Sequence, residues 1–226
     1  SRIGKILVLT GEHQQSRVVP VLFRWTLWAL SANRPMHVHL APDLPQTEDL
    51  VASGSTCIAY ETVTDNFGRL PLLAPMSEVA GRMSIQAGAH CLEKSQGGKG
   101  MLLGGVPGVA AAKVVIIGGG TVGRHAAAMA LGTGADVWIL DRSNDVLKSL
   151  WSQFGSSVHT VYSTHDAIEQ HVISADLVIG GVLIPGAAAP KLVSTEMIKK
   201  MGAGSVLVDV AIDQGGCFET SHATRS

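Results

Sequence analysis

The sequence has few cysteines, little net charge and no long apolar run. The three cysteines, Cys57, Cys91 and Cys217, form no C-x-x-C pair, which is typical of thiols kept reduced in a cytoplasm. A formal net charge of -1 gives no field that would attract nucleic acid or an anionic membrane. No run reaches the roughly 18 apolar residues of a membrane span, and Arg24 interrupts the most apolar N-terminal stretch. These absences predict a soluble cytoplasmic protein that binds neither nucleic acid nor membrane.

From residue 113 onward, short runs of branched apolar residues alternate with helical segments. Continuous apolar runs of this length are typical of strands that are covered on both faces of a sheet. The alternation predicts an α/β fold, a doubly wound parallel sheet of Rossmann type. The expected strands cover 114–117, 136–140, 159–162, 177–179 and 205–210, and the expected helices cover 121–132, 144–154, 165–172 and 195–201.

The chain before residue 113 is less regular. Residues 77–92 contain few helix breakers and have apolar positions at helical spacing, which predicts a long helix leading into the sheet. Residues 58–61 have the composition of a further strand. Residues 1–36 show no clean alternation of strand and helix, and no architecture is assigned to them.

A glycine-rich turn follows the first expected strand of the sheet. The pattern G-x-G-x-x-G falls on Gly118, Gly120 and Gly123, between a strand and a helix. An acid, Asp141, lies 18 residues past the last glycine, at the end of the next strand. The pattern alone is weak, but this context is typical of a dinucleotide-binding turn.

Each part of the turn has a physical task in binding a dinucleotide. The first glycine allows a sharp turn, the second lets the backbone approach a diphosphate, and the third lets helix and strand pack closely. Free N–H groups at Thr121 and Val122 would face the diphosphate. The carboxylate of Asp141 would accept hydrogen bonds from the adenosine ribose and repel a 2′-phosphate, which favours NAD. Arg142 is the feature that would instead suit NADP.

Two other kinds of site are not supported. A nucleotide triphosphatase loop would need Gly-Lys followed by serine or threonine, whereas Lys99 lies in GGKGM. Histidines such as His125 and His159 have no spacing typical of metal ligands, so no metal site is predicted.

Long segments on both sides of the glycine turn resemble the alanine dehydrogenase family over residues 39–222. Members oxidise L-alanine reversibly to pyruvate and ammonia with NAD, have a substrate domain and a nucleotide domain, and usually form hexamers. The related α subunit of proton-translocating transhydrogenase shares the fold, but its second strand typically ends in Asp-x-Arg, whereas LDRSND here follows the dehydrogenase. The segments are HLAPDLPQTEDL, CIAYETV, LPLLAPMSEVAGRMSIQAGAHCLEKSQGGKGMLLGGVPGV, ADLVIGGVLIPGAAAPKLV and VLVDVAIDQGGCFETS.

The resemblance implies two catalytic residues. His39, in HLAP, matches the catalytic histidine, and an imidazole that titrates near neutrality suits proton transfer. Asp213, in VDVAIDQGG, matches the second catalytic residue, which would orient water or stabilise a positive imine. Asp209 is the competing carboxylate, and its place inside the last strand favours a structural role.

The resemblance also implies cofactor contacts beyond the glycine turn. Ser77 would bond the cofactor, and Ser163 would lie near the adenine. Val182 and Leu183 would follow the fourth strand. The residues that would run beneath the nicotinamide are Val210, Ala211, Ile212 and Asp213.

The chain departs from the family at its two ends. Only 38 residues precede His39, and the chain stops at Ser226, whereas family members have more residues at both ends. The implied domains are an incomplete substrate domain, 1–76 with 1–36 atypical, and a dinucleotide-binding domain, 77–226. We therefore also keep two alternatives: a non-catalytic module for NAD binding or subunit interaction, and a transhydrogenase nucleotide subunit.

Overall fold

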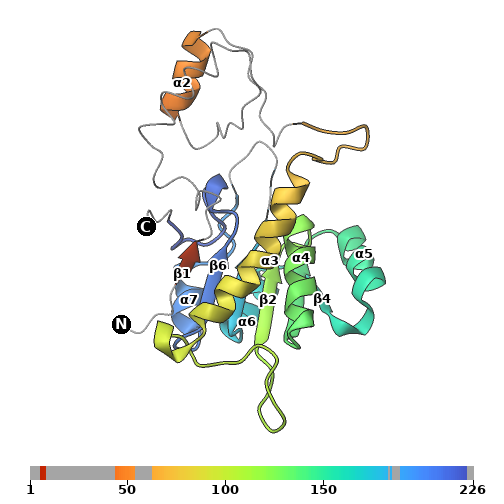
Figure 1. The fold of residues 1–226 in the computed structure, drawn as a ribbon, viewed down its shortest axis with the longest axis vertical. Coiled ribbons are helices and arrows are strands. Elements are labelled where there is room, and N and C mark those ends of the chain that lie inside the picture. Colours follow the sequence, from red (N-terminus) through yellow and green to blue (C-terminus); the bar gives the residue numbers. More distant parts are fainter. Residues whose placement is uncertain (1–5, 9–43, 54–62, 183, 185–188, 223–226) are drawn as a thin grey trace.

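A six-stranded parallel sheet forms the centre of the computed structural model, which describes residues 6–8, 44–53, 63–182, 184 and 189–222. The strand order is β1-β6-β5-β2-β3-β4. The strands β3 and β4 therefore lie on one side of β2, and the later strands β5 and β6 lie on its other side (Figure 1). The boundary between β2 and β5 is therefore the topological switch point, where such sheets bind ligands. The strands are β1 (Ile6–Val8), β2 (Lys113–Ile117), β3 (Asp136–Asp141), β4 (His159–Tyr162), β5 (Leu177–Gly180) and β6 (Val206–Asp209).

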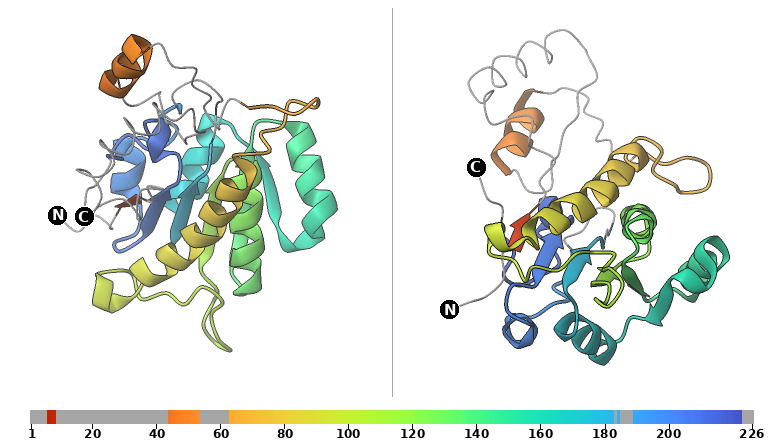
Figure 2. Two further views of the ribbon diagram at one scale, coloured as in Figure 1. Left: turned by 45° about the horizontal axis from the view of Figure 1, so that its top comes forward. Right: turned by 60° about the horizontal axis from the view of Figure 1, so that its bottom comes forward.

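Helices cover both faces of this sheet. The helices α3, α4 and α5 pack on one face and α6 and α7 on the other (Figure 2). No helix in the described ranges is both long and apolar enough to cross a membrane. The α-helices are α2 (Leu44–Ser53), α3 (Ala74–Cys91), α4 (Thr121–Gly132), α5 (Asn144–Phe154), α6 (His165–Ile173) and α7 (Thr195–Lys200), and the short 3-10 helices are η2 (Lys94–Gln96), η3 (Gly155–Ser157) and η4 (Ile212–Gln214).

The central strand β2 shows how the sheet forms two cores. Val114 and Ile116 pack with α3, α4 and α5, while Val115 and Ile117 pack with α6 and α7. Successive side chains of a strand point to opposite faces, so a strand covered on both sides must be apolar at every position. This requirement explains the unbroken run of branched residues.

The doubly wound α/β fold expected from the sequence is confirmed. Helices 121–132 and 144–154 have the expected bounds. The helix expected from residue 77 begins earlier, at Ala74, because Pro75 occupies its first turn, where a fixed φ and a missing N–H are compatible with a helix. The strand expected at 58–61 lies outside the described residues.

One strand was not expected from the sequence. β1 pairs in parallel with β6, with Ile6 opposite Leu207 and Val8 opposite Asp209. It comes from the stretch to which no architecture was assigned, and it extends the sheet beyond β6. The division of the chain at residue 76 stays a prediction.

The helices α3 and α4 meet through a glycine. A Cβ built on Gly81 would lie 2.3 Å from the carbonyl oxygen of Val122 and 3.0 Å from the Cβ of His125. Any larger residue would force the two helices apart, since real Cβ contacts are never that short. The helix α3 is therefore held against the first turn of α4.

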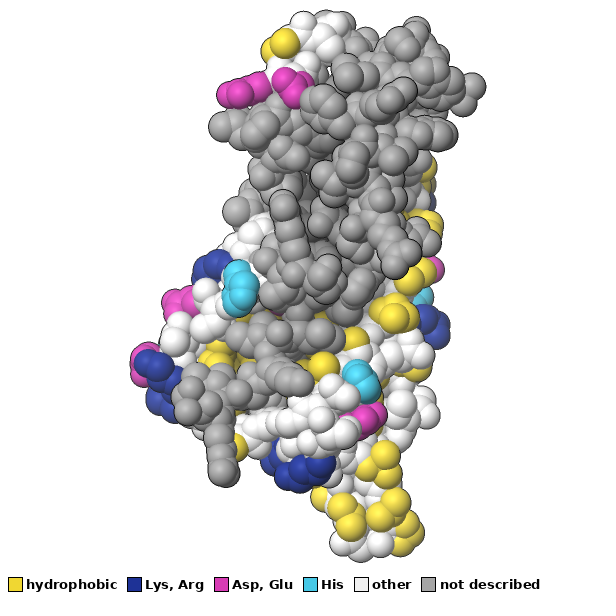
Figure 3. All heavy atoms as spheres, turned by 60° about the vertical axis from the view of Figure 1, so that its left-hand side comes forward, with side chains coloured by type: hydrophobic (Ala, Val, Ile, Leu, Met, Phe, Trp, Pro, Cys, Tyr) yellow, Lys and Arg dark blue, Asp and Glu magenta, His cyan; other side chains and the backbone are white. Residues whose placement is uncertain are grey.

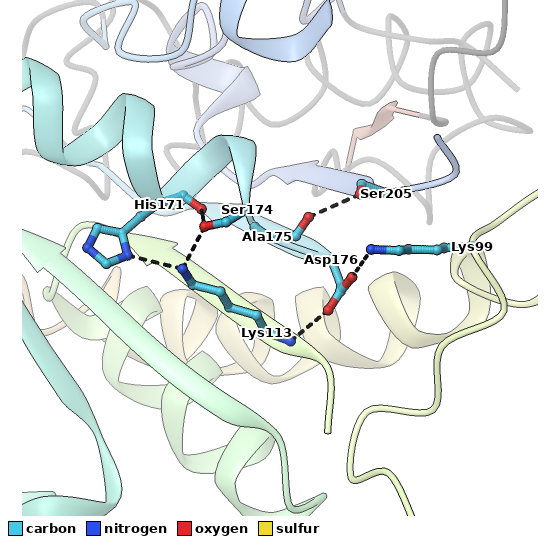
Figure 4. Close-up of polar contacts among 7 residues, drawn as sticks. All are labelled: Lys99, Lys113, His171, Ser174, Ala175, Asp176 and Ser205. Carbon is cyan, nitrogen blue, oxygen red and sulfur yellow. Dashed lines mark hydrogen bonds and ion pairs between the residues drawn. The ribbon is translucent and has the colours of Figure 1, made fainter. Parts of the chain in front are cut away.

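At the amino ends of the strands, a buried carboxylate joins three segments of the chain (Figure 4). Asp176, just before β5, accepts a hydrogen bond from the backbone N–H of Lys113 at 2.9 Å and forms an ion pair with the ammonium of Lys99. The backbone N–H of Lys99 in turn donates to the carbonyl of Gly204 at 2.8 Å, just before β6. These contacts fix the loop that leads from α3 to β2.

The side chain of Lys113 crosses the same end of the sheet (Figure 4). Its ammonium lies 2.7 Å from the hydroxyl of Ser174, 3.3 Å from Nδ1 of His171 and 4.8 Å from the ring centre of Trp138. Burial lowers the pKa of Lys113, and burial together with the Lys113 charge lowers the pKa of His171. At neutral pH the imidazole is therefore uncharged and accepts from the lysine.

Replacing Asp176 should destabilise the fold without touching the glycine turn. Asp176→Asn removes the ion pair with Lys99 and leaves an amide among donors, which should cost about 2 kcal/mol of unfolding free energy. For a chain of this length the thermal midpoint should fall by roughly 4–8 °C, measured by calorimetry. Asp166→Asn, at a fully exposed carboxylate of α6, is the matched control. Equal midpoints for the two variants would contradict the assigned role.

Candidate functional site

The glycine turn lies between β2 and α4, at the carboxyl end of the central strand. Gly118 has φ +100°, a left-handed conformation that side chains other than glycine rarely adopt. A Cβ there would also lie 2.8 Å from the carbonyl oxygen of Gly181, in the segment after β5. The first glycine therefore permits both the sharp turn and the close approach of two loops at the switch point.

The other two glycines of the pattern have different environments. A Cβ on Gly123 would lie 1.9 Å from the carbonyl oxygen of Gly118 and 3.3 Å from a methyl of Ile116, so this position packs the helix onto the turn and strand. A Cβ on Gly120 would have no atom of the described residues within 4 Å. Gly120 thus borders open space, and its lack of a side chain is not required by the protein's own packing.

The amino end of α4 faces this open space with its backbone N–H groups. Gly120 is the N-cap, and no side chain in the described part of the chain accepts from the first turn. The first N–H groups of a helix have no partner within the helix, and the helix dipole adds partial positive charge there. Thr121 and Val122 supply two of these groups, so this end of α4 suits a diphosphate.

The carboxylate of Asp141 points at the glycine turn from the end of β3. Its Oδ2 accepts from the backbone N–H of Gly119 at 2.7 Å, and its Oδ1 accepts from the backbone N–H of Ser143 at 2.8 Å. Each oxygen keeps further lone pairs that a ribose hydroxyl could use. The backbone N–H of Ser163 donates to the carbonyl of Asp141 at 3.0 Å, so the residue expected near the adenine lies beside it.

The segment after β5 closes on the turn from the other side. The backbone N–H of Gly181 donates to the carbonyl of Ile117 at 2.9 Å. A Cβ on Gly118 would lie 3.2 Å from a methyl of Val182, which places Val182 against the turn. Leu183 lies outside the described residues.

The segment after β6 reaches the same edge of the sheet. The backbone N–H of Val210 donates to the carbonyl of Gly180 at 2.9 Å, and Ala211 and Ile212 are buried. Asp213 belongs to η4, but its side chain lies outside the described part of the chain. His39 also lies outside the described residues.

Ser77 approaches the site from α3. It lies one helical turn before Gly81, and residues four apart share a face of a helix, so Ser77 is on the face that meets the first turn of α4.

The structure thus brings one group of expected residues to the carboxyl edge of the sheet, although their contacts with a cofactor stay predictions. That group comprises Ser77, Gly118, Gly120, Thr121, Val122, Gly123, Asp141, Ser163, Val182, Val210, Ala211 and Ile212, together with the backbone of Asp213.

Two glycines of the site were not singled out from the sequence. Gly119 donates the N–H that holds Asp141, and Gly181 makes the close approach to Gly118. The pattern G-x-G-x-x-G leaves its x positions unassigned, and the doubled glycines in IGGG and IGG were the available signal.

Comparison with known proteins decides the family. The family model described as alanine dehydrogenase/PNT, C-terminal domain, matches residues 84–226. The chain belongs to the alanine dehydrogenase/PNT family. The resemblance inferred from the sequence motifs is therefore confirmed.

Members of this family are similar to the chain over most of its length. The chain is 59% identical over 197 residues to an alanine dehydrogenase of Halomonas elongata, covering 86% of this chain and 53% of that protein. It is 58% identical over 184 residues to an alanine dehydrogenase of Methanococcus maripaludis, covering 81% and 49%. The chain thus spans about half the length of the curated relatives it matches.

Solved structures agree with this assignment. An L-alanine dehydrogenase superposes with a TM-score of 0.78 at 54% identity, covering 84% of this chain and 52% of the other. A transhydrogenase from Sinorhizobium meliloti superposes with a TM-score of 0.69 at 25% identity, covering 83% and 56%. The sequence is therefore much closer to the dehydrogenases than to this transhydrogenase.

The residues present in this member of the family fit a dinucleotide. Open space borders Gly120, uncapped N–H groups face it, and the carboxylate of Asp141 lies at its margin. At Gly118 and Gly123, by contrast, a larger side chain would clash with neighbouring atoms of the protein itself. The fit rests on the shape and charge of the turn, and NAD is the dinucleotide that this combination favours.

Two glycine substitutions should separate binding from folding. Gly120→Val places its side chain in open space at φ -69°, so unfolding free energy should change by less than about 1 kcal/mol, while affinity for NADH should fall at least about tenfold. Gly123→Ala should cost about 3 kcal/mol through its clash with the turn. Denaturant unfolding and NADH fluorescence titration measure the two effects. A Gly120→Val variant with the parent's NADH affinity would contradict the placement of the diphosphate.

Proposed function

We propose that this chain supplies the NAD-binding part of an L-alanine dehydrogenase. The reaction converts L-alanine, water and NAD⁺ into pyruvate, ammonium and NADH with release of a proton, and it is reversible. The observation that carries the proposal is the glycine turn, with Asp141 facing it, in a chain 54–59% identical to alanine dehydrogenases.

A bound nicotinamide would supply the redox chemistry, as the acceptor of hydride from the substrate Cα. The chain's own residues supply position. N–H groups at Thr121 and Val122 would hold the diphosphate, and Asp141 would hold the adenosine ribose and repel a 2′-phosphate. Arg142, the residue that would suit NADP, is exposed, whereas the carboxylate of Asp141 is fixed against the turn. This difference supports NAD as the cofactor.

The catalytic roles rest on the family resemblance. His39 would move protons as the amine becomes an iminium and water adds to it. Asp213 would orient that water or stabilise the positive imine, and its backbone lies at the carboxyl end of β6, where open α/β sheets bind ligands. The transhydrogenase alternative is weaker, because identity to the solved transhydrogenase is 25% against 54% to the solved dehydrogenase.

Turnover of alanine tests the proposed activity. The purified protein should reduce NAD in the presence of L-alanine, as followed by absorbance of the reduced cofactor. His39→Ala should lower turnover by about a hundredfold through loss of proton transfer, while NADH affinity should stay within about twofold of the parent. His90→Ala, at an exposed histidine near the end of α3, is the control. NADH binding without turnover in the parent would favour the non-catalytic NAD-binding module.

We also propose that the protein forms a homo-oligomer, a hexamer by resemblance to the family. The loop 101–111 has no charged residue, and its tip is a tight turn closed by the backbone pair Val106 and Val109. Leu102, Val106 and Val109 are 53–61% exposed. Figure 3 shows apolar side chains gathered at the lower end of the molecule, where Figure 1 places this loop. Exposed apolar surface of this kind is typical of interfaces.

A charge in this loop should weaken association. In Val106→Glu the new carboxylate would lose its water in an apolar interface, which costs free energy. The mass of this variant in solution, measured by light scattering, should therefore fall below that of the parent. Trp151→Glu, at an exposed apolar residue of α5, is the matched control and should keep the parent's mass. A monomeric parent, or a Val106→Glu variant with unchanged mass, would contradict this interface.

A cytoplasmic location is part of the same proposal. Cys217 is buried, and its thiol lies 3.5 Å from a carboxylate oxygen of Asp209, to which it donates. A thiol used in this way suits a reducing compartment.

A further inference from the structure

Asp209 ends β6 with its side chain fully buried among donors from the chain that follows. Its Oδ2 accepts from the backbone N–H groups of Cys217 and Phe218 at 2.9 and 3.2 Å, and from the hydroxyl of Ser221 at 2.6 Å. Its Oδ1 accepts from the backbone N–H of Ala211 at 3.1 Å and from the thiol of Cys217 at 3.5 Å. Five donors from residues 211–221 thus converge on one carboxylate.

The loop 210–221 approaches this carboxylate as closely as packing allows. Gly216 has φ +73°, and a Cβ there would lie 2.7 Å from Oδ2 of Asp209. A Cβ on Gly180, at the end of β5, would lie 2.3 Å from Sγ of Cys217. Glycine is therefore needed on both sides of the contact, and the loop packs closely over the ends of β5 and β6.

The charge of Asp209 is balanced by these donors. Among the described residues, no lysine or arginine forms an ion pair with it, so backbone N–H groups, a hydroxyl and a thiol replace the water lost on burial. Burial, and next the charge of Asp209, raise the pKa of Cys217, which keeps that thiol protonated as a donor. A neutral side chain in place of Asp209 could not satisfy all five donors.

A lysine holds the same loop from its outer side. The ammonium of Lys191 donates to the carbonyl of Phe218 at 3.0 Å and to the carbonyl of Gly215. The loop is thus fixed by a buried anion through its N–H groups and by a cation through its carbonyl groups. The helix η4, which includes the backbone of Asp213, lies between Ala211, held by Asp209, and Gly215, held by Lys191.

We propose that Asp209 is a positioning residue for the reaction: its buried carboxylate fixes loop 210–221 so that residues 210–213 stand at the nicotinamide end of the site. This inference rests on the proposed function. The adenosine and diphosphate end is built separately, from the turn at Gly118 to Gly123 and from Asp141, and within the described residues no hydrogen bond joins Asp209 to that turn or to Asp141. Loss of Asp209 should therefore affect one end of the dinucleotide and spare the other.

The test compares two ligands that share the adenosine end. Asp209→Asn keeps the shape of the side chain but replaces one acceptor oxygen by an NH₂ that faces donors. Affinity for NADH should fall by about tenfold, whereas affinity for ADP-ribose, which lacks nicotinamide, should change less than about twofold. Fluorescence titration and calorimetry on the full chain measure the two affinities.

Asp176→Asn is the matched control, because Asp176 is a second buried carboxylate, at the opposite end of the strands. It should lower thermal stability but leave the ratio of NADH to ADP-ribose affinity at the parent's value. Hydrogen exchange gives a second readout that needs no ligand. The amides of residues 211–218 should exchange at least about tenfold faster in Asp209→Asn than in Asp176→Asn.

The outcomes separate this inference from the proposed function. A parent that binds neither ligand would refute the proposed function, and the positioning role with it. A parent that binds both, with an unchanged affinity ratio or unchanged loop exchange in Asp209→Asn, would refute the positioning role alone. If Asp209→Asn does not fold, Ser221→Ala removes one donor and should shift the ratio in the same direction by about threefold; an unchanged ratio there would also refute the role.

Discussion

The hydrogen bond from the N–H of Gly119 to the carboxylate of Asp141 is the contact on which the candidate site depends. It joins the turn after β2 to the end of β3, and the carbonyl of Asp141 in turn holds Ser163 after β4. On the other side, Gly118 meets the backbone of Gly181 after β5. The ends of four parallel strands, β2, β3, β4 and β5, therefore meet at one edge of the sheet.

Much of this edge could be predicted from the sequence because its signals are local. The left-handed φ of Gly118 and the close packing of Gly123 are properties of one turn, and the spacing of the motif reports them directly. β1 could not be predicted, because three apolar residues form a strand only when β6 supplies the partner. Asp209 was expected to be structural, but the sequence does not show that its donors come from residues 211–221.

The two buried carboxylates differ in the groups that neutralise them. Asp176 pairs with the ammonium of Lys99, which is partly exposed, and this ties together loops at the amino ends of the strands. Asp209 is surrounded by uncharged donors at the carboxyl ends. A partly exposed ion pair is screened by salt, whereas the Asp209 contacts are buried and short-ranged. The contacts of Asp209 should therefore respond less to salt than the ion pair of Asp176 with Lys99.

The contact at Gly81 has a mechanical consequence for the molecule. Because α3 touches α4 backbone to backbone beside Val122, α3 cannot rotate about its axis without displacing the helix end that would receive the diphosphate. An anion bound there would stiffen both helices together. A displacement of α3, which begins at Ala74, would therefore also displace the amino end of α4 at the nucleotide end of the sheet.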